Sequence, residues 1–81
     1  MTVNNAVAKR IFELLEQRGI TQYRLEQITG IQHGSMQCIM NGRNKTVTLS
    51  TIIMIARGFG ISLVEFLNDD IFSSDDLEVE K

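Results

Sequence analysis

The sequence lacks the residues from which several classes of protein are built. Its 81 residues include one cysteine and one histidine, so we expect no disulfide framework, no metal site and no cofactor. Proline is absent, which favours uninterrupted helices over a loop-rich fold. The longest apolar run, Ile52 to Ala56, is far too short to span a membrane, and the first residues lack the pattern of a secretion signal. These absences predict a cytoplasmic protein without membrane contact.

Charge is distributed unevenly along this short chain. Residues 1–67 hold 7 basic and 4 acidic side chains, whereas beyond them acidic residues dominate and Lys81 is the single base. A mildly basic body is compatible with a polyanionic partner, although the excess is too small to require one. The length supports a single core. We therefore predict a helix-turn-helix domain over residues 1–68 and an acidic C-terminal tail over residues 69–81, most simply a solvated terminus.

Five segments show the three- and four-residue apolar spacing of amphipathic helices. The residues expected to face the core are Val3, Val7, Ile11, Leu14, Leu15, Leu25, Ile28, Met36, Ile39, Met40, Leu49, Ile52, Ile53, Ala56 and Phe59. The expected N-caps are Thr21, Thr48 and Ser62, the last in a capping box with Glu65. Glycines at the ends of the segments are natural helix stops. The pattern predicts an all-α bundle of five short helices.

The most informative stretch runs from Thr21 to Gly42. Its two short helices are joined by the tight connection Gly30-Ile31-Gln32 and are expected to cross steeply, as in a helix-turn-helix. Such an arrangement projects the second helix away from the body of the domain. Its N-terminal end can then enter the major groove of DNA, which is about wide enough for one α-helix.

A familiar order of residues runs through this stretch and beyond it. It comprises Thr21-Gln22 through Leu25, Ile28-Thr29-Gly30-Ile31, Met36, Ile39 and Asn41-Gly42, then Leu49, Ile52-Ile53, Ala56, Phe59-Gly60-Ile61-Ser62 and Leu63 to Leu67. Over about residues 5 to 68 the chain resembles the lambda-repressor-like (Cro/CI, or XRE) helix-turn-helix family. The resemblance implies a compact five-helix lambda-repressor-like bundle. It also implies a sequence-specific DNA-binding transcriptional regulator, a repressor, that inserts helix 3 (about His33 to Asn41) in the major groove.

The resemblance further implies which side chains contact double-stranded DNA. Base contacts fall on Gln32, His33, Gly34, Gln37 and Cys38. Phosphate contacts fall on Gln22, Ser35, Asn41, Arg43, Asn44 and Lys45. The two leading positions, His33 and Gly34, hold no arginine, asparagine or glutamine, so direct base contacts would be few and DNA shape would matter more. A neutral His33 can donate to one acceptor such as guanine N7.

Relatives of this size usually act as dimers, because one short recognition helix contacts few bases. Candidates for a homodimer interface are Met54, Val64, Phe66, Ile71 and Phe72. The alternative for Phe72 is that it folds back onto the core of its own domain. Either arrangement is compatible with the sequence.

Two other classes of function were weighed against a DNA-binding regulator. One is a protein-interaction module, such as an antitoxin or anti-repressor component, that keeps the fold with weak or no DNA binding and takes a protein partner. Gly34, Cys38 and the net charge of −2 favour this module, whereas Gln22 and Arg43 oppose it. The other is an enzyme, which we do not expect, because His33 and Cys38 are poorly aligned on a helix and lack a third orienting residue.

Overall fold

The computed structural model describes residues 1–43 and 47–79, and the predicted phosphate contacts Asn44 and Lys45 lie outside them. Within the described residues the helices are α1 (Val3–Arg18), α2 (Gln22–Thr29), α3 (His33–Met40), α4 (Leu49–Gly58) and α5 (Leu63–Leu67), followed by the short 3-10 helix η1 (Asp70–Phe72). The described part of the chain forms no sheet and has a single isolated bridge, between Thr2 and Glu78. The predicted all-α five-helix bundle is confirmed.

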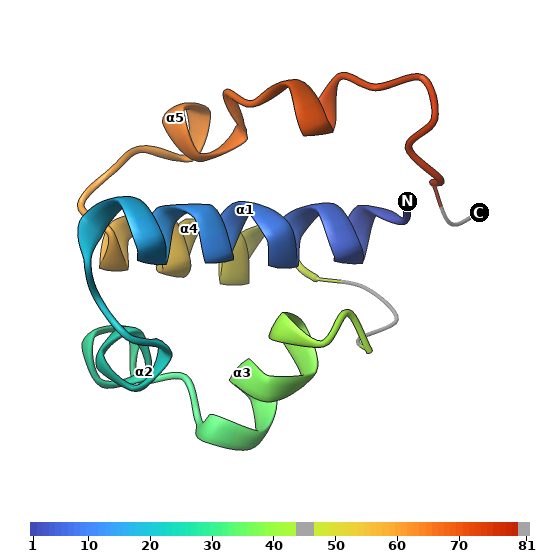
Figure 1. Ribbon diagram of the computed structural model, residues 1–81. Coiled ribbons are helices and arrows are strands. Elements are labelled where there is room, and N and C mark those ends of the chain that lie inside the picture. The colour runs from blue at the N-terminus through green and yellow to red at the C-terminus, as the bar shows by residue number, and fades with distance from the viewer. Residues whose placement is uncertain (44–46, 80–81) are drawn as a thin grey trace.

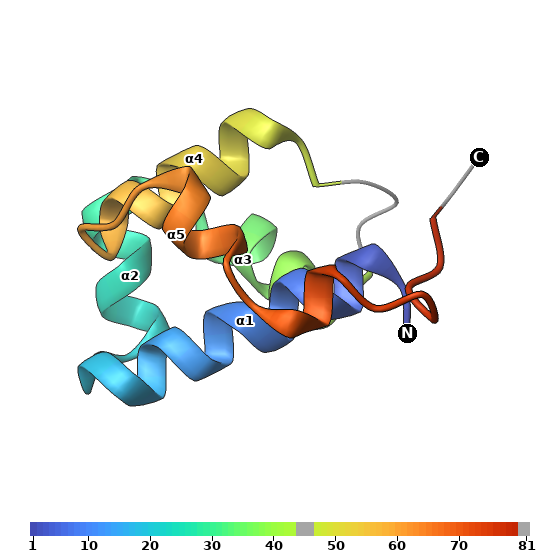
Figure 2. The same ribbon diagram turned by 90° about the horizontal axis from the view of Figure 1, so that it is seen from above.

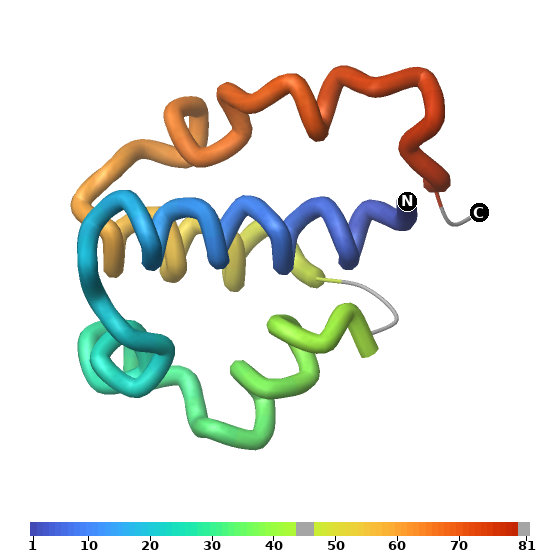
Figure 3. Tube along the Cα trace, viewed as in Figure 1, coloured from blue at the N-terminus to red at the C-terminus, as the bar shows by residue number. Residues whose placement is uncertain are grey.

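The helices surround one core in three tiers. Figure 1 shows α1 and α4 in the middle tier, α5 and η1 on one side of them, and α2 and α3 on the other. Seen from above in Figure 2, α5 lies between α1 and α4. The trace in Figure 3 shows α2 nearly end-on while α3 runs across the view, so these two helices cross steeply. This crossing is the one expected of a helix-turn-helix.

The helix starts follow from local sequence. Thr21, Thr48 and Ser62 each accept a hydrogen bond from the backbone N–H three residues further on, at 3.1, 3.2 and 3.1 Å. These side chains satisfy one of the N–H groups that the first turn of a helix leaves unpaired. The three N-caps predicted from the sequence are confirmed.

The core is built from one apolar stripe on each helix. Its largest fully buried side chains are Phe66, Ile11, Leu25, Met36, Ile55 and Val7. Three residues of α3 (Met36, Ile39 and Met40) belong to this core and hold the helix to α1. Gly58 of α4 allows a close approach of α2, since an added Cβ would lie 2.8 Å from the Thr29 methyl carbon. The orientation of the α2–α3 pair is therefore fixed by packing on two sides.

Two of the predicted core residues face the solvent instead. Ile28 is 47% exposed and Leu49 is 57% exposed, whereas Ile55, which was not predicted, is fully buried. In α4 the buried positions are Ile52, Ile55 and Ala56. The helix is rich in apolar residues all round, so its spacing alone does not determine which face meets α2 and α5.

The start of the acidic tail is packed onto the domain, contrary to the expectation of a solvated terminus. Phe72 packs against the core, with its ring centroid 6.3 Å from that of Phe66. Further along, the Val3 N–H donates to the Glu78 carbonyl and the Glu78 N–H donates to the Met1 carbonyl. The folded unit therefore extends past residue 68, because the apolar Phe72 interrupts the run of acids.

Candidate nucleic-acid interface

The N-terminal half of α3 is presented to solvent. The residues Gln32, His33, Gly34, Ser35 and Gln37 are exposed, while the buried stripe of α3 anchors the opposite face. Cys38, predicted to contact a base, is only half-exposed. In Figure 1 this end of α3 lies on the side of the molecule away from α5 and η1. A surface of this shape can be approached by a duplex.

The first turn of α3 has no side-chain cap. Gln32 occupies the N-cap position with extended backbone and makes no capping hydrogen bond, as its side chain predicts. Backbone N–H groups of this turn are left without the partner that Thr21 supplies at α2. Free N–H groups and the positive end of the helix dipole favour an anionic oxygen at this position.

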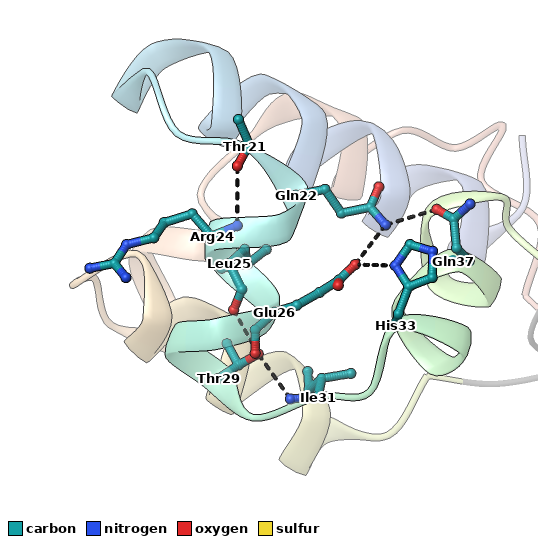
Figure 4. Close-up of polar contacts among 9 residues, drawn as sticks. All are labelled: Thr21, Gln22, Arg24, Leu25, Glu26, Thr29, Ile31, His33 and Gln37. Atoms are coloured by element: carbon teal, nitrogen blue, oxygen red, sulfur yellow. Dashed lines mark hydrogen bonds and ion pairs between the residues drawn. The ribbon is translucent and has the colours of Figure 1, made fainter.

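Four side chains from α2 and α3 form a hydrogen-bonded cluster beside this turn (Figure 4). The Gln22 amide nitrogen donates to the Glu26 carboxylate at 2.9 Å and to the Gln37 amide oxygen at 2.8 Å. The same Glu26 oxygen lies 2.9 Å from Nδ1 of His33. We call Gln22, Glu26, His33 and Gln37 the polar cluster. It joins two predicted base contacts and one predicted phosphate contact through a residue that was not predicted.

The carboxyl group of Glu26 is ionised within the polar cluster. The hydrogen bond from Gln22 is the largest cause that lowers the pKa of this carboxyl, and the contact with His33 lowers it further. Burial of the side chain opposes them by raising the pKa, but the net direction is downward. An ionised carboxylate only accepts hydrogen bonds, so Nδ1 of His33 must carry the proton that it shares with Glu26.

Most of the chain matches one family model. The model describes the Cro/C1-type HTH DNA-binding domain and covers residues 10–70. The chain belongs to this family. No match was found among curated proteins or among solved structures. In this Cro/C1-type domain α2 and α3 are the helix-turn-helix, and the resemblance stated from the sequence is confirmed.

In this Cro/C1-type domain the polar cluster engages the amide of Gln22. The sequence predicts that its amide anchors a phosphate, but both N–H bonds are directed to Glu26 and Gln37. In this arrangement the amide has no N–H left for a phosphate. Gln37, in contrast, accepts through its oxygen, and its amide nitrogen points away from the cluster (Figure 4). Gln37 is therefore free to donate outward.

Basic side chains near α3 are few among the described residues. Arg43 follows α3 and is exposed. Arg24 is exposed too, but it points away from His33 and the rest of the polar cluster (Figure 4). Asn41 and Ser35 are exposed at the two ends of the helix. Among the described basic residues, Arg43 is the one that directly follows α3 in the chain.

Sequence reasoning missed Glu26. It stands beside other polar residues of the stretch Gln22 to Gln27, where a single carboxylate carries no distinctive signal. A usable signal was available in the helix-turn-helix itself. Positions 22 and 26 share a helix face, and a steep crossing brings the start of the next helix against that face. The burial of this carboxylate depends on that crossing.

The candidates for a dimer interface separate into three groups by exposure. Phe66 is fully buried and Phe72 packs on it, so both belong to the core of their own chain, and including Phe66 in a surface patch was wrong. Ile71 is half-buried. Met54 and Val64 are 43% and 77% exposed on α4 and α5. Of the predicted candidates, Met54 and Val64 are therefore the apolar side chains exposed enough to contact a second chain.

The described residues show neither a candidate metal site nor a candidate membrane span. They contain no group of three or more His, Cys, Asp or Glu side chains able to hold a metal ion. No helix among them is both long enough and apolar enough to cross a membrane.

Proposed function

We propose that this Cro/C1-type domain is a sequence-specific transcriptional repressor, acting in the cytoplasm, that inserts the N-terminal half of α3 in the major groove. The observation that carries the proposal is the division of α3 into two faces. Met36, Ile39 and Met40 are buried, whereas the side chains at the opposite face and at the start of the helix are exposed and polar. Other surface helices share this division, but α3 is the second helix of the helix-turn-helix and its exposed, uncapped start is the end that such a helix directs at DNA.

Both ends of α3 carry groups suited to phosphate contacts in the proposed orientation. The uncapped start of α3 offers backbone N–H groups to one phosphate, and exposed Arg43 follows the other end of the helix. Contacts at both ends would hold α3 along the groove. His33 and Gln37 would then face base edges, because both side chains are exposed on the same side of the helix.

A homodimer completes the proposal, since one short helix contacts few bases. Exposed Met54 and Val64 are the apolar side chains that would meet in the interface. Sedimentation should give a mass of two chains at micromolar concentration, and Val64→Lys should return it to one. If only one wild-type chain is found on a duplex with two symmetric half-sites, the proposed dimer is contradicted.

Fluorescence anisotropy with a random-sequence duplex, repeated over a series of salt concentrations, tests whether the domain binds DNA through phosphate contacts. Affinity that rests on phosphate contacts falls steeply as salt rises. Arg43→Ala should weaken binding and reduce the salt slope by about one. The matched control is Lys9→Ala, which removes the same charge from the side of α1 that faces Asp69 and Asp70. If the two substitutions weakened DNA binding equally, the duplex would not bind at the surface of α3.

A second candidate is a protein-interaction module without DNA binding. Two observations favour it: the charged group in the polar cluster is the acid Glu26, and Arg24 points away from that cluster. The salt series separates the two candidates. A module that binds a protein through α3 would show no measurable anisotropy change with any duplex, even at low salt.

A further inference from the structure

The position of Glu26 is costly for a protein that approaches phosphates with this surface. Its side chain is 9% exposed, and it lies between α2 and the exposed start of α3. A carboxylate at this position repels the DNA backbone and must be removed from water. Glu26 nevertheless receives hydrogen bonds from two side chains of the polar cluster. Glu26 therefore acts through the two side chains that it contacts, Gln22 and His33.

The effect on His33 follows from the chemistry of the two groups. A neutral imidazole has one N–H donor and one bare nitrogen that accepts. The ionised carboxylate of Glu26 only accepts, so it selects the form of His33 whose proton is on Nδ1. Nε2 is then the bare nitrogen. It lies on the side of the ring away from Nδ1, and 70% of the His33 side chain is exposed.

Gln22 holds the carboxylate in this position. Its amide nitrogen binds the same Glu26 oxygen that contacts His33 and binds Gln37 as well. The carboxylate is therefore oriented from α2 at one side and by the imidazole at the other. Among the described residues, Glu26 is the ionisable group in contact with the imidazole, while the other two members of the cluster are neutral amides.

We propose that Glu26 is a positioning residue that determines base preference by fixing the Nδ1–H form of His33, so that Nε2 accepts a hydrogen bond from DNA. This proposal rests on the proposed function. In the major groove the donors are the amino groups of cytosine N4 and adenine N6. His33 then selects cytosine or adenine at the position it contacts. The guanine N7 partner expected from the sequence is rejected, because two acceptors would face each other.

The first test needs no DNA and no substitution. His33 is the single histidine of the chain, so a two-bond ¹⁵N–¹H correlation spectrum contains one imidazole. At about pH 8, where an ordinary histidine is neutral, we expect a protonated Nδ1 and a bare Nε2. A proton on Nε2, alone or together with one on Nδ1, would overturn the proposal whether or not the protein binds DNA.

The second test measures base preference by selection from a randomised duplex pool at the same pH. Glu26→Met keeps a side chain of similar length but removes the acceptor, which releases His33 to the Nε2–H form. We expect the preference for cytosine over guanine and thymine at one position to be reversed, by about threefold to tenfold, whereas adenine, which presents both a donor and the N7 acceptor, should change less. Glu16→Met, which removes a charge from the exposed face of α1, should leave the preference unchanged.

The outcomes separate this inference from the proposed function. If wild-type protein selects a sequence and Glu26→Met selects the same one, Glu26 does not determine base preference. A uniform gain in affinity, without a change of base, would mean that Glu26 acts only by repelling phosphates. If the Nδ1–H form is present but no duplex binds at low salt, the proposed function fails and the specificity role fails with it.

Discussion

The guanidinium of Arg10, in α1, donates to the backbone carbonyl of Phe66, in α5, over 2.7 Å. A second nitrogen donates to the Glu65 carbonyl at 2.9 Å, and the side chain is 8% exposed. The last carbonyls of a helix have no partner within it. The buried arginine therefore adds two donors at the C-terminal end of the five-residue α5, where the Asn68 N–H also donates to the Glu65 carbonyl, and it ties the first helix to the last.

Replacing Arg10 should destabilise the domain strongly. Arg10→Met preserves most of the apolar stem but leaves the Phe66 carbonyl without its side-chain donor and Asp69 without its ion-pair partner, which should lower the free energy of unfolding by about 2–4 kcal/mol. Urea denaturation followed by circular dichroism measures the loss. The control is Arg18→Met, because Arg18 is 41% exposed and its pair with Glu65 spans 3.8 Å. The control should cost less than about 1 kcal/mol, and equal losses would contradict the role given to Arg10.

The two glycines at the ends of α3 should respond in opposite directions to the same substitution. A Cβ on Gly34 would meet nothing within 4 Å, so Gly34→Ala should stabilise the helix by about 0.5–1 kcal/mol. Gly42 has φ of +67°, and a Cβ there would overlap the Asn5 side chain. Gly42→Ala should cost about 1–2 kcal/mol. Thermal unfolding of both variants measures whether the unfolding temperature rises or falls. A lower unfolding temperature for Gly34→Ala would contradict the open surroundings of Gly34.

The polar cluster should make stability depend on acid. The hydrogen bond from Gln22 holds the pKa of Glu26 below its ordinary value of 4.5. Folding then favours the ionised form, so this contribution is complete above the ordinary pKa and is lost as the pH falls through the lowered one. Urea midpoints measured downward from neutral pH should fall less steeply for Glu26→Gln than for wild type. Glu16→Gln should follow the wild-type curve, and parallel curves for all three would refute the linkage.

Phe72 should contribute to stability although it lies in the acidic segment. Its ring packs on Phe66 at the edge of the core, so Phe72→Ala should lower the free energy of unfolding by about 1–3 kcal/mol. Val79 is 72% exposed, and Val79→Ala should change stability by less than about 0.5 kcal/mol. A negligible change in stability for Phe72→Ala would mean that the segment around Phe72 is solvated and does not pack on the core.

What the sequence could reveal depends on how far apart the interacting residues are. The N-caps Thr21, Thr48 and Ser62 were predictable, because each acts on an amide three residues away. The direction of Ile28 and Leu49 was not, since the face that a short helix buries is decided by its neighbours. The apolar spacing identifies the helix, but it does not determine which face of the helix is buried.

The candidate site shows the same limit. The exposed residues at the start of α3 were predictable from the order of helices and from the family resemblance. The contact of Glu26 with His33 has no local signal, and it follows only when the shared helix face of positions 22 and 26 is combined with the steep crossing of the two helices. Arg10 was harder still, for its partner is a backbone carbonyl 56 residues away, and a carbonyl leaves no mark in the sequence.

The central claim is that the start of α3 is the surface that meets DNA. Backbone ¹H–¹⁵N chemical shifts measured during titration with a short duplex test it most directly. We expect the largest changes over residues 32–37 and at Arg43, with small changes at Met54, Val64 and η1. Changes concentrated on α4, α5 or η1, with α3 unaffected, would contradict the account.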